Sequence, residues 1–293
     1  MTNSSLLQSY PCPVCSGSKT KHLYKIKGFN IVRCLSCTMV YVNPRLRNED
    51  VYDIYRTDYF TNKEHGYENY ELTDHLRNKT FQRWYSDIEP NLLLKSGTAL
   101  DVGCASGSFL RLLIQKGWDA KGIELDRDMF ENVRQHGFDV SNRPLEYYDS
   151  SVKFQLITLF DVIEHLPFLN NDLKKLSGLL DRDGSIAIVT PNINSMQHKL
   201  FGKKWFQFKP GEHINYFSPK TLEQVVKPYN LKVKHVSSCG QFADFSFLHH
   251  RLNKYGFAYM ASLMKKCMNM PGLKDKVLYA GTGSMLVILQ KTL

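Results

Sequence analysis

The chain contains 293 residues, of which 43% are hydrophobic and 23% charged, and its 18 Gly and 11 Pro show no repeating period. This composition excludes a wholly disordered chain and a collagen-like fibre. The 38 Lys and Arg exceed the 28 Asp and Glu by ten, a positive charge that suits RNA, phosphorylated metabolites and anionic lipids equally and identifies no partner.

No segment has the pattern of a membrane span or an export signal. The longest apolar runs, such as residues 156–160, are far shorter than the roughly 20 residues that cross a bilayer. Residues 1–5 lack the basic and apolar regions of a secretory signal. We therefore expect a soluble protein of the cytoplasm.

Four of the seven cysteines form two CxxC pairs near the N-terminus. Cys12 and Cys15 precede Cys34 and Cys37, with 18 residues between the pairs. Four thiolates on two tight turns suit a structural Zn²⁺, and a segment this short needs the metal in order to fold. We predict a zinc-ribbon domain over residues 1–45, whose role in docking, substrate capture or structure stays open. A redox CxxC pair is the alternative.

The next segment, 46–95, is polar and rich in aromatic residues, and its pattern predicts a helical linker or lid. Pro90 ends this segment, and residues 95–97 predict a turn into the next domain. The aromatic residues of the segment include Tyr52, Tyr55, Tyr59, Phe60, Tyr67 and Tyr70.

From residue 98 onward, short apolar segments alternate with helical ones. This alternation predicts right-handed crossovers and a mainly parallel sheet, so we expect an α/β, Rossmann-like domain over 96–293. The expected strands are 99–102, 120–124, 154–160, 185–190, 231–237 and 284–290, and the expected helices are 108–116, 128–136, 169–180 and 219–227.

Two segments interrupt this alternation. Residues 192–219 form an aromatic and basic insertion after the strand expected at 185–190, at the edge where a doubly wound sheet binds its ligands. Residues 241–270 are apolar and basic, and they predict either an amphipathic helical pair over the site or a surface for peripheral membrane contact.

The segment from Leu100 to Phe109 predicts a strand, a small-residue turn and a helix, where a ligand meets free backbone N–H groups. It departs twice from the Gly-x-Gly-x-x-Gly pattern of dinucleotide sites, at Ala105 and Ser108. Asp101, two residues before Gly103, suits a cationic ligand better than a pyrophosphate. S-adenosylmethionine, with its ammonium and sulfonium, therefore fits this turn better than a nicotinamide dinucleotide.

Glu124 ends the second predicted strand, 23 residues after Asp101. An acid about 20 residues after the first strand holds the ribose hydroxyls in doubly wound nucleotide sites. The alternative for Glu124 alone is a solvated acid at a strand end, but together with Asp101 and the glycine turn it indicates a nucleoside site.

These motifs, with Phe160 to Leu166 (FDVIEHL), resemble class I S-adenosylmethionine-dependent methyltransferases, whose sheet has seven strands. Residues 41–45 (YVNPR) and 212–219 (EHINYFSP) are similar to a bacterial branch with an N-terminal CxxC…CxxC domain, often found in enzymes of sugar metabolism. The resemblance covers most of residues 12–235. It implies that the cofactor is bound by Asp101, Gly103, Ala105, Gly107, Glu124, Leu125, Phe160 and Asp161.

The resemblance departs from the family at several positions. Ala105 replaces the usual middle glycine of the turn. No Asp follows the third strand at the usual adenine-binding position, so Pro144 and Leu145 are left to sandwich the ring. Pro210 replaces a Tyr that stands two residues before Glu212 in the similar sugar C-methyltransferases.

Methyl transfer requires an aligned acceptor and, where the acceptor is protonated, a base. His213 is the candidate base because it lies in the insertion and because histidine titrates near neutral pH. The resemblance implies that Glu212 acts with it, and Tyr216 is a candidate replacement phenol. His165 is a second candidate base, although the family's Glu-His pair is mainly structural. A loop-anchoring role for His213 is the alternative.

We expect a methyltransferase for a small or carrier-linked acceptor, such as a sugar or a related hydroxylated metabolite. A second reading is an RNA methyltransferase that uses the zinc ribbon and the basic surface to hold phosphates. A third is a non-enzymatic adaptor that keeps the cofactor as a structural ligand. The sequence leaves open whether oxygen, nitrogen or carbon is methylated, and it leaves the oligomeric state unknown.

Overall fold

The computed structural model describes residues 7–56, 74–254, 256, 258–268 and 276–292. A central sheet of seven strands runs through the molecule in the order β12-β13-β10-β9-β6-β7-β8. The predicted α/β fold class and seven-stranded sheet are therefore confirmed. The strands are β6 (Gly97–Val102), β7 (Trp118–Ile123), β8 (Asp139–Ser141), β9 (Phe154–Phe160), β10 (Leu180–Pro191), β12 (Leu231–Asp244) and β13 (Val277–Lys291).

The central part of this sheet is parallel. Strands β10, β9, β6, β7 and β8 pair in parallel, whereas β13 pairs antiparallel with both β10 and β12. The middle strands are buried almost throughout, because helices cover both of their faces. The carboxyl ends of β6, β7 and β9 consequently meet at one edge of the sheet, where ligands bind in such folds.

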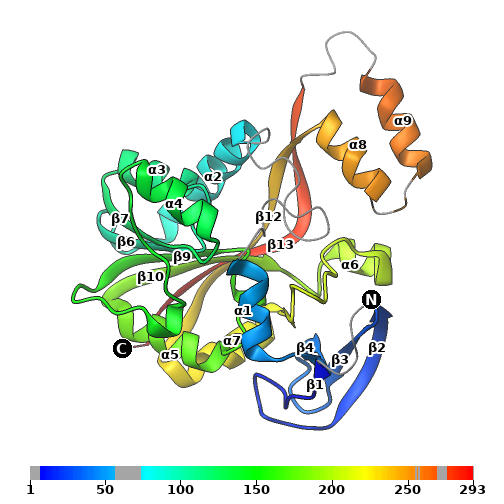
Figure 1. Ribbon diagram of the computed structural model, residues 1–293, viewed down its shortest axis with the longest axis horizontal. Coiled ribbons are helices and arrows are strands. Elements are labelled where there is room, and N and C mark those ends of the chain that lie inside the picture. Colours follow the sequence, from blue (N-terminus) through cyan, green and yellow to red (C-terminus); the bar gives the residue numbers. More distant parts are fainter. Residues whose placement is uncertain (1–6, 57–73, 255, 257, 269–275, 293) are drawn as a thin grey trace.

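Two groups of helices cover the sheet (Figure 1). Residues of α2, α3 and α4 pack in one core cluster, and residues of α5 and α7 pack in another on the opposite face. The helices are α1 (Asn48–Arg56), α2 (Asp74–Ile88), α3 (Ser108–Gln115), α4 (Arg127–Gln135), α5 (Leu169–Leu179), α6 (Met196–Phe201), α7 (Pro219–Val226), α8 (Phe245–Lys254) and α9 (Ala258–Met268).

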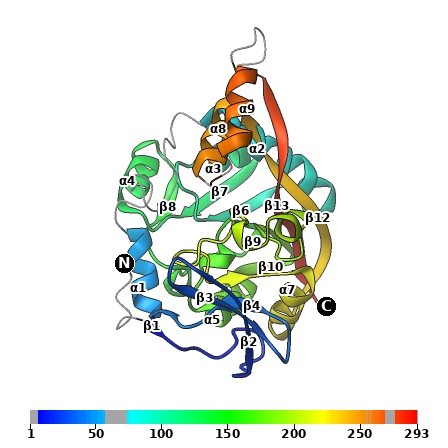
Figure 2. The ribbon, with the colours of Figure 1, turned by 90° about the vertical axis from the view of Figure 1, so that its right-hand side faces the viewer.

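The N-terminal domain and the insertion share one small sheet. Its order is β11-β4-β3-β2. Strand β11 lies in the insertion (192–219) and pairs with β4, so the insertion adds an edge strand to the sheet of the N-terminal domain (1–45). In both views the small sheet lies below the central sheet (Figure 1 and Figure 2). Its strands are β2 (Thr20–Ile26), β3 (Phe29–Cys34), β4 (Val40–Val42) and β11 (Asn215–Tyr216), and β1 (Leu7–Gln8) pairs separately with β5 (Arg45–Leu46).

Strands β12 and β13 are longer than expected and form an arm that leaves the main sheet (Figure 1). The expected strands 231–237 and 284–290 cover only their inner halves. Residues 241–244, expected within a helical pair, belong to β12 because they pair with residues 277–280 of β13. Helices α8 and α9 follow at the end of the arm. Among the residues that the structure describes, no helix is long and apolar enough to cross a membrane.

Two further expectations concern the lid and the fifth strand. Tyr59, Phe60, Tyr67 and Tyr70 of the expected lid lie outside the described residues. Residues 181–184, expected as a turn after α5, are assigned to β10, which changes register between Leu180 and Ser185. Residues 181–184 therefore form the irregular part of β10 between its two paired positions, Leu180 and Ser185.

Gly122 of β7 and Gly178 of α5 make a matched pair for testing this packing. A Cβ at Gly122 would lie 2.7 Å from Cys104 Sγ and 2.9 Å from Val140 Cγ1, whereas a Cβ at Gly178 meets nothing within 4 Å. We expect Gly122→Ala to lower the free energy of unfolding by about 1–3 kcal/mol. Gly178→Ala should raise it by about 0.5–1 kcal/mol, because alanine is the better helix former. Urea unfolding measures both, and equal effects would contradict the packing.

Candidate functional site

The loop after β6 is built from small residues with left-handed backbone conformations. Gly103, Ala105 and Gly107 have φ values of +75°, +47° and +73°, and α3 begins directly afterwards at Ser108. A Cβ at Gly103 would lie 2.7 Å from Val162 Cγ2, so this position requires glycine for space as well as for conformation. Ala105 adopts a conformation that costs a non-glycine residue about 1–2 kcal/mol, and the loop holds it there.

Glu124 fixes this loop to the end of β7. Its Oε2 accepts a hydrogen bond of 2.8 Å from the backbone N–H of Ala105, and its Oε1 accepts one of 2.8 Å from Asp126. The Glu124 side chain is buried, and burial raises its pKa to about 7. The two backbone hydrogen bonds act in the opposite direction, because they favour the ionised carboxylate.

Asp101 lies at the end of β6, next to the strand that Glu124 follows. Its Oδ1 accepts a hydrogen bond from Thr158 of β9 at 2.5 Å. Burial raises the pKa of Asp101 to about 7, while the Thr158 hydrogen bond lowers it and the charge of Glu124 raises it further. Two buried acids with few donors around them form a site that favours a ligand with cationic or hydrogen-bond-donating groups.

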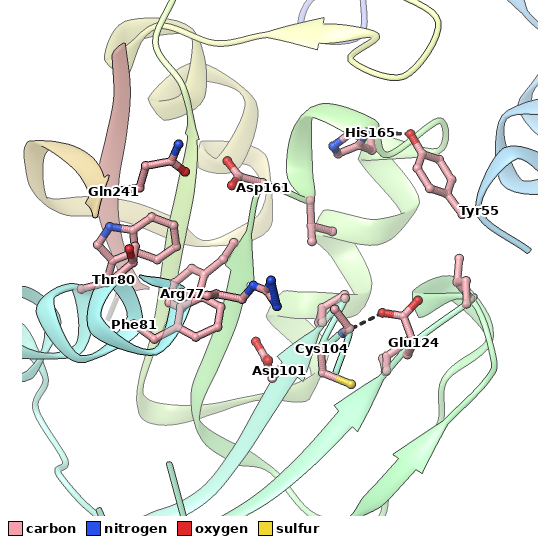
Figure 3. A pocket seen from close by; sticks show the side chains of 18 of the residues that line it. Tyr55, Arg77, Thr80, Phe81, Asp101, Cys104, Glu124, Asp161, His165 and Gln241 are labelled. Atoms are coloured by element: carbon pink, nitrogen blue, oxygen red, sulfur yellow. Dashed lines mark hydrogen bonds between the residues drawn. The ribbon is translucent and has the colours of Figure 1, made fainter. Parts of the chain in front are cut away.

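Both acids line a single cavity (Figure 3). Of the residues that the sequence assigns to the cofactor, Asp101, Gly103, Ala105, Glu124, Leu125, Phe160 and Asp161 line this cavity, as does the candidate base His213. Gly107 lies at the start of α3, where a Cβ would meet Val133 at 3.1 Å. For the expected adenine sandwich, Leu145 lines the cavity and Pro144 precedes it in the chain. These assignments remain predictions about binding.

One wall of the cavity was missed by sequence reasoning. Arg77, Thr80 and Phe81 project from α2 into the cavity, and Gln241 enters it from the arm (Figure 3). Phe160 joins this wall through ring contacts with Phe109 at 4.7 Å and Trp84 at 5.1 Å between centroids. The aromatic spacing Phe81–Trp84 on a helix was the available signal, but periodicity alone does not say which helix faces a ligand. The other α2 and arm residues in the lining are Leu76, Trp84, Phe242, Phe247 and Arg251.

Asp161 follows β9 in a left-handed conformation with φ of +54°. Burial raises its pKa to about 6, and the charges of Lys209 and Arg251 act in the opposite direction. Asp161, Lys209 and Arg251 all line the cavity, so its lining contains both signs of charge.

His165 and His213 meet at right angles, with ring centroids 4.7 Å apart. The Tyr55 hydroxyl lies 2.6 Å from His165 Nδ1, which links α1 to the site (Figure 3). Burial lowers the pKa of His165 to about 4 and lowers that of His213 well below its ordinary value, aided by His165 and Lys209. Both imidazoles are therefore neutral at pH 7 and keep a lone pair.

The other two predicted catalytic residues lie outside the cavity lining given by the described residues. Glu212 contributes its backbone carbonyl to Tyr55 and His165, at 3.3 and 3.1 Å. Tyr216 is fully buried in β11 and packs against Phe208 at 5.1 Å between ring centroids. No observation tests their catalytic roles, which stay predictions.

The four N-terminal cysteines converge. The sulfurs of Cys12 and Cys37 are 3.4 Å apart, those of Cys15 and Cys34 are 3.5 Å apart, and all four lie within 4.8 Å of one another. A zinc ion bonded to four sulfurs at about 2.3 Å places them about 3.8 Å apart, whereas a disulfide needs about 2.05 Å. The arrangement fits a closed zinc site.

The surface expected to contact lipid lies partly on α9. Tyr259, Met260 and Leu263 are exposed there, and Lys265 and Lys266 follow in the last turn. Residues 269–270 of the expected segment lie outside the described residues, and lipid contact stays a prediction.

Comparison with known proteins shows the family to which this chain is similar. A family profile described as "Methyltransferase domain" matches residues 73–236. A ubiquinone biosynthesis O-methyltransferase from Methylococcus capsulatus is 32% identical over 192 residues, which cover 61% of this chain and 81% of that protein. The chain spans 52% and 64% of the length of relatives with the same name from Bordetella avium and Pelagibacter ubique.

Two solved structures share the fold. A chain in the complex of the Haloferax volcanii Trm112 activator with a methyltransferase aligns with a TM-score of 0.55 and 13% identity, over 82% of this chain and 98% of that chain. A SAM-dependent methyltransferase from Thermotoga maritima aligns with a TM-score of 0.51 and 17% identity, over 83% of this chain and all of that chain.

Proposed function

The chain belongs to the methyltransferase-domain family, and on this premise we propose that it transfers a methyl group from S-adenosylmethionine to a hydroxylated acceptor. The observation that carries the proposal is the pair of buried acids, Asp101 and Glu124, at the ends of adjacent parallel strands in one cavity. Between them runs the left-handed loop of Gly103 and Ala105.

The residues present suit this cofactor. S-adenosylmethionine supplies a methyl group activated by a positive sulfur. Asp101 offers a desolvated carboxylate to the ammonium of the methionine end, and Glu124 has lone pairs left for the ribose hydroxyls after accepting its two backbone hydrogen bonds. The rings of Phe81, Trp84 and Phe160 line the cavity and present apolar faces that attract a cationic sulfur.

The acceptor side is formed by His165, His213 and Lys209. An acceptor hydroxyl that attacks the methyl carbon forms an O–C bond while the S–C bond breaks, and its proton must leave. The neutral imidazole of His213, whose Nδ1 has no hydrogen-bond partner among the described residues, is the group that takes this proton. Glu212 helps to place it through the backbone contacts to His165 and Tyr55.

An oxygen acceptor is favoured by the relatives that are named O-methyltransferases. The acceptor class that we propose is a sugar or a related hydroxylated metabolite, small or linked to a carrier. A screen of nucleotide sugars, catechol-type quinone precursors and total RNA for conversion of S-adenosylmethionine to S-adenosylhomocysteine separates this proposal from RNA methylation.

Zinc completes the proposal. Cys12, Cys15, Cys34 and Cys37 hold one structural Zn²⁺, and the ribbon sheet in turn supports the insertion through β4 and β11. The ion therefore acts on catalysis indirectly, by fixing the backbone on which His213 is carried.

Replacement of Glu124 tests its role in cofactor binding. We expect Glu124→Ala to weaken S-adenosylmethionine binding at least tenfold in calorimetry while the circular dichroism spectrum is unchanged. Glu131→Ala, which removes an exposed acid of α4 paired with Arg134, is the matched control and should bind normally. Unchanged affinity in Glu124→Ala would refute the ribose assignment.

The same acids predict a pH dependence. Their pKa values are raised to about 7, so both bind protons below that pH, whereas the bound cofactor favours their ionised forms. Cofactor affinity should fall from pH 8 to pH 6, by about tenfold for each acid that must ionise. Asp101→Asn should flatten this slope. A slope that is flat in the unmodified protein would contradict the assignment.

Replacement of His213 tests its role as proton acceptor. His213→Ala should lower kcat by about 10²–10⁴ with little change in cofactor affinity. Because the pKa of His213 lies well below its ordinary value, kcat of the unmodified enzyme should show no imidazole titration between pH 6 and 8. His198→Gln, a change in the same insertion but outside the cavity lining, is the control. Parallel losses of binding and turnover in His213→Ala would remove the proton-acceptor role.

Zinc content tests the four-cysteine site. We expect about one zinc per chain by atomic absorption, lost in Cys34→Ser and retained in Cys239→Ser, which changes a buried cysteine of β12. Loss of zinc should reduce kcat more than cofactor affinity, because the cofactor acids lie on the central sheet. Full zinc content in Cys34→Ser would rule out the four-cysteine site.

A further inference from the structure

A second group of metal-ligating side chains lies inside the cavity wall. Glu164, His165 and His213 each place one ligand atom within 4.8 Å of the other two. Glu164 and His165 follow β9 in a short 3-10 helix (Ile163–His165), and His213 comes from the insertion. Both imidazoles line the cavity, and Glu164 is fully buried behind them.

Two of the three side chains carry a buried polar atom without a partner. Glu164 Oε2 accepts a 3.0 Å hydrogen bond from Thr190, but Glu164 Oε1 and His213 Nδ1 have no hydrogen-bond partner among the described residues. An unsatisfied buried acceptor costs about 1–3 kcal/mol, and more when charged. Three ligand atoms that converge here, on side chains of which two carry an atom without a hydrogen-bond partner among the described residues, form a site for a cation.

Hydrogen bonds to neighbouring groups fix the orientation of each histidine. His165 Nδ1 lies 2.6 Å from the Tyr55 hydroxyl and 3.1 Å from the Glu212 carbonyl. His213 makes a backbone hydrogen bond with Gln207, and its Nδ1 is the unpartnered atom. Histidine ligands of metals are oriented in this way, by donating their second N–H to a carbonyl.

We propose that Glu164, His165 and His213 bind one divalent transition-metal ion beside the cofactor. Two imidazoles and one carboxylate suit Mn²⁺, Fe²⁺, Co²⁺ or Zn²⁺, whereas Mg²⁺ and Ca²⁺ prefer oxygen ligands throughout. Three protein ligands leave coordination positions open toward the cavity. The ion is distinct from the zinc of the four cysteines, which form a closed thiolate site.

This inference rests on the proposed methyl transfer and changes one detail of it. An acceptor with two neighbouring hydroxyls chelates the ion through the open positions, and the ion lowers the pKa of the hydroxyl that reacts. The proton then leaves to water before the transfer, the oxygen forms its bond to the methyl carbon, and the S–C electron pair stays on sulfur. His213 in that case holds the ion instead of accepting the proton.

Lys209 limits the affinity of this site. Its charge lowers the pKa of Glu164, His165 and His213, so it acts on all three ligands, and it lines the same cavity. A bound divalent ion must overcome the repulsion of this ammonium. We therefore expect binding in the micromolar range, and tighter binding when Lys209 is replaced by methionine.

The test is a titration of the purified full chain with MnCl₂, followed by the electron paramagnetic resonance signal of free Mn²⁺. Mn²⁺ is chosen because thiolate sites discriminate against it. We expect one Mn²⁺ per chain, at least tenfold weaker binding in Glu164→Gln and in His213→Gln, and tighter binding in Lys209→Met. His198→Gln is the matched control and should bind normally. Circular dichroism checks folding, and two independent ligand variants keep the test decisive if one of them unfolds.

The inference is overturned if no Mn²⁺ binds at millimolar concentration, or if binding is equal in both ligand variants and the unmodified chain. Failure of the proposed function has a different signature. S-adenosylmethionine binding is measured by calorimetry in the zinc-containing chain without added Mn²⁺, and absence of that binding contradicts the methyl-transfer proposal whatever the Mn²⁺ titration shows. Normal cofactor binding without Mn²⁺ binding leaves His213 as the proton acceptor.

Discussion

The backbone of Ile214 joins the three parts of the molecule that meet at the site. Its N–H donates to the Glu164 carbonyl at 3.0 Å, and its carbonyl accepts from Val42 of β4 at 3.0 Å. The N-terminal sheet, the insertion and the segment after β9 are therefore connected by backbone hydrogen bonds. Because His213 directly precedes Ile214, its imidazole can face His165 only while this connection is intact. The cysteine cluster thus acts on the cavity through hydrogen-bonded backbone and needs no contact with substrate.

Burial of ionisable groups is the second constraint. Asp101, Glu124, Asp161, Glu164, His165 and His213 are all removed from water within one region, and burial is the largest cause of each pKa shift. Such burial opposes folding unless partners compensate for the lost hydration. A cationic cofactor that binds the folded chain supplies part of this compensation and stabilises the protein by mass action. The buried ionisable groups therefore favour a charged ligand, and they lower the free energy of unfolding of the ligand-free chain.

The arm shows how a ligand cavity is closed by elements distant in sequence. Strand β12 brings Gln241 and Phe242 to the cavity, and α8 adds Phe247 and Arg251. Composition identified residues 241–270 as apolar and basic, which predicted either a helical pair or a lipid-contacting surface. Residues 241–244 instead pair with β13, and Trp84 of α2 donates a 2.8 Å hydrogen bond to the carbonyl of the neighbouring Gly240. Residues 241–244 pair with residues 277–280, which are distant in the chain, so no local sequence pattern predicts this part of β12.

The sequence by itself determined the α/β alternation, the glycine turn after β6, Glu124 at the end of β7 and the two cysteine pairs. Each of these depends on residues close together in the chain: a strand and its turn, or two residues on a knuckle. Tertiary structure decided that β11 completes the N-terminal sheet, that α2 and the arm wall the cavity, and that Tyr216 is buried in a core while His213 lines the cavity. Those outcomes depend on pairing and packing between segments far apart, and neither composition nor periodicity encodes which partner a buried face will meet.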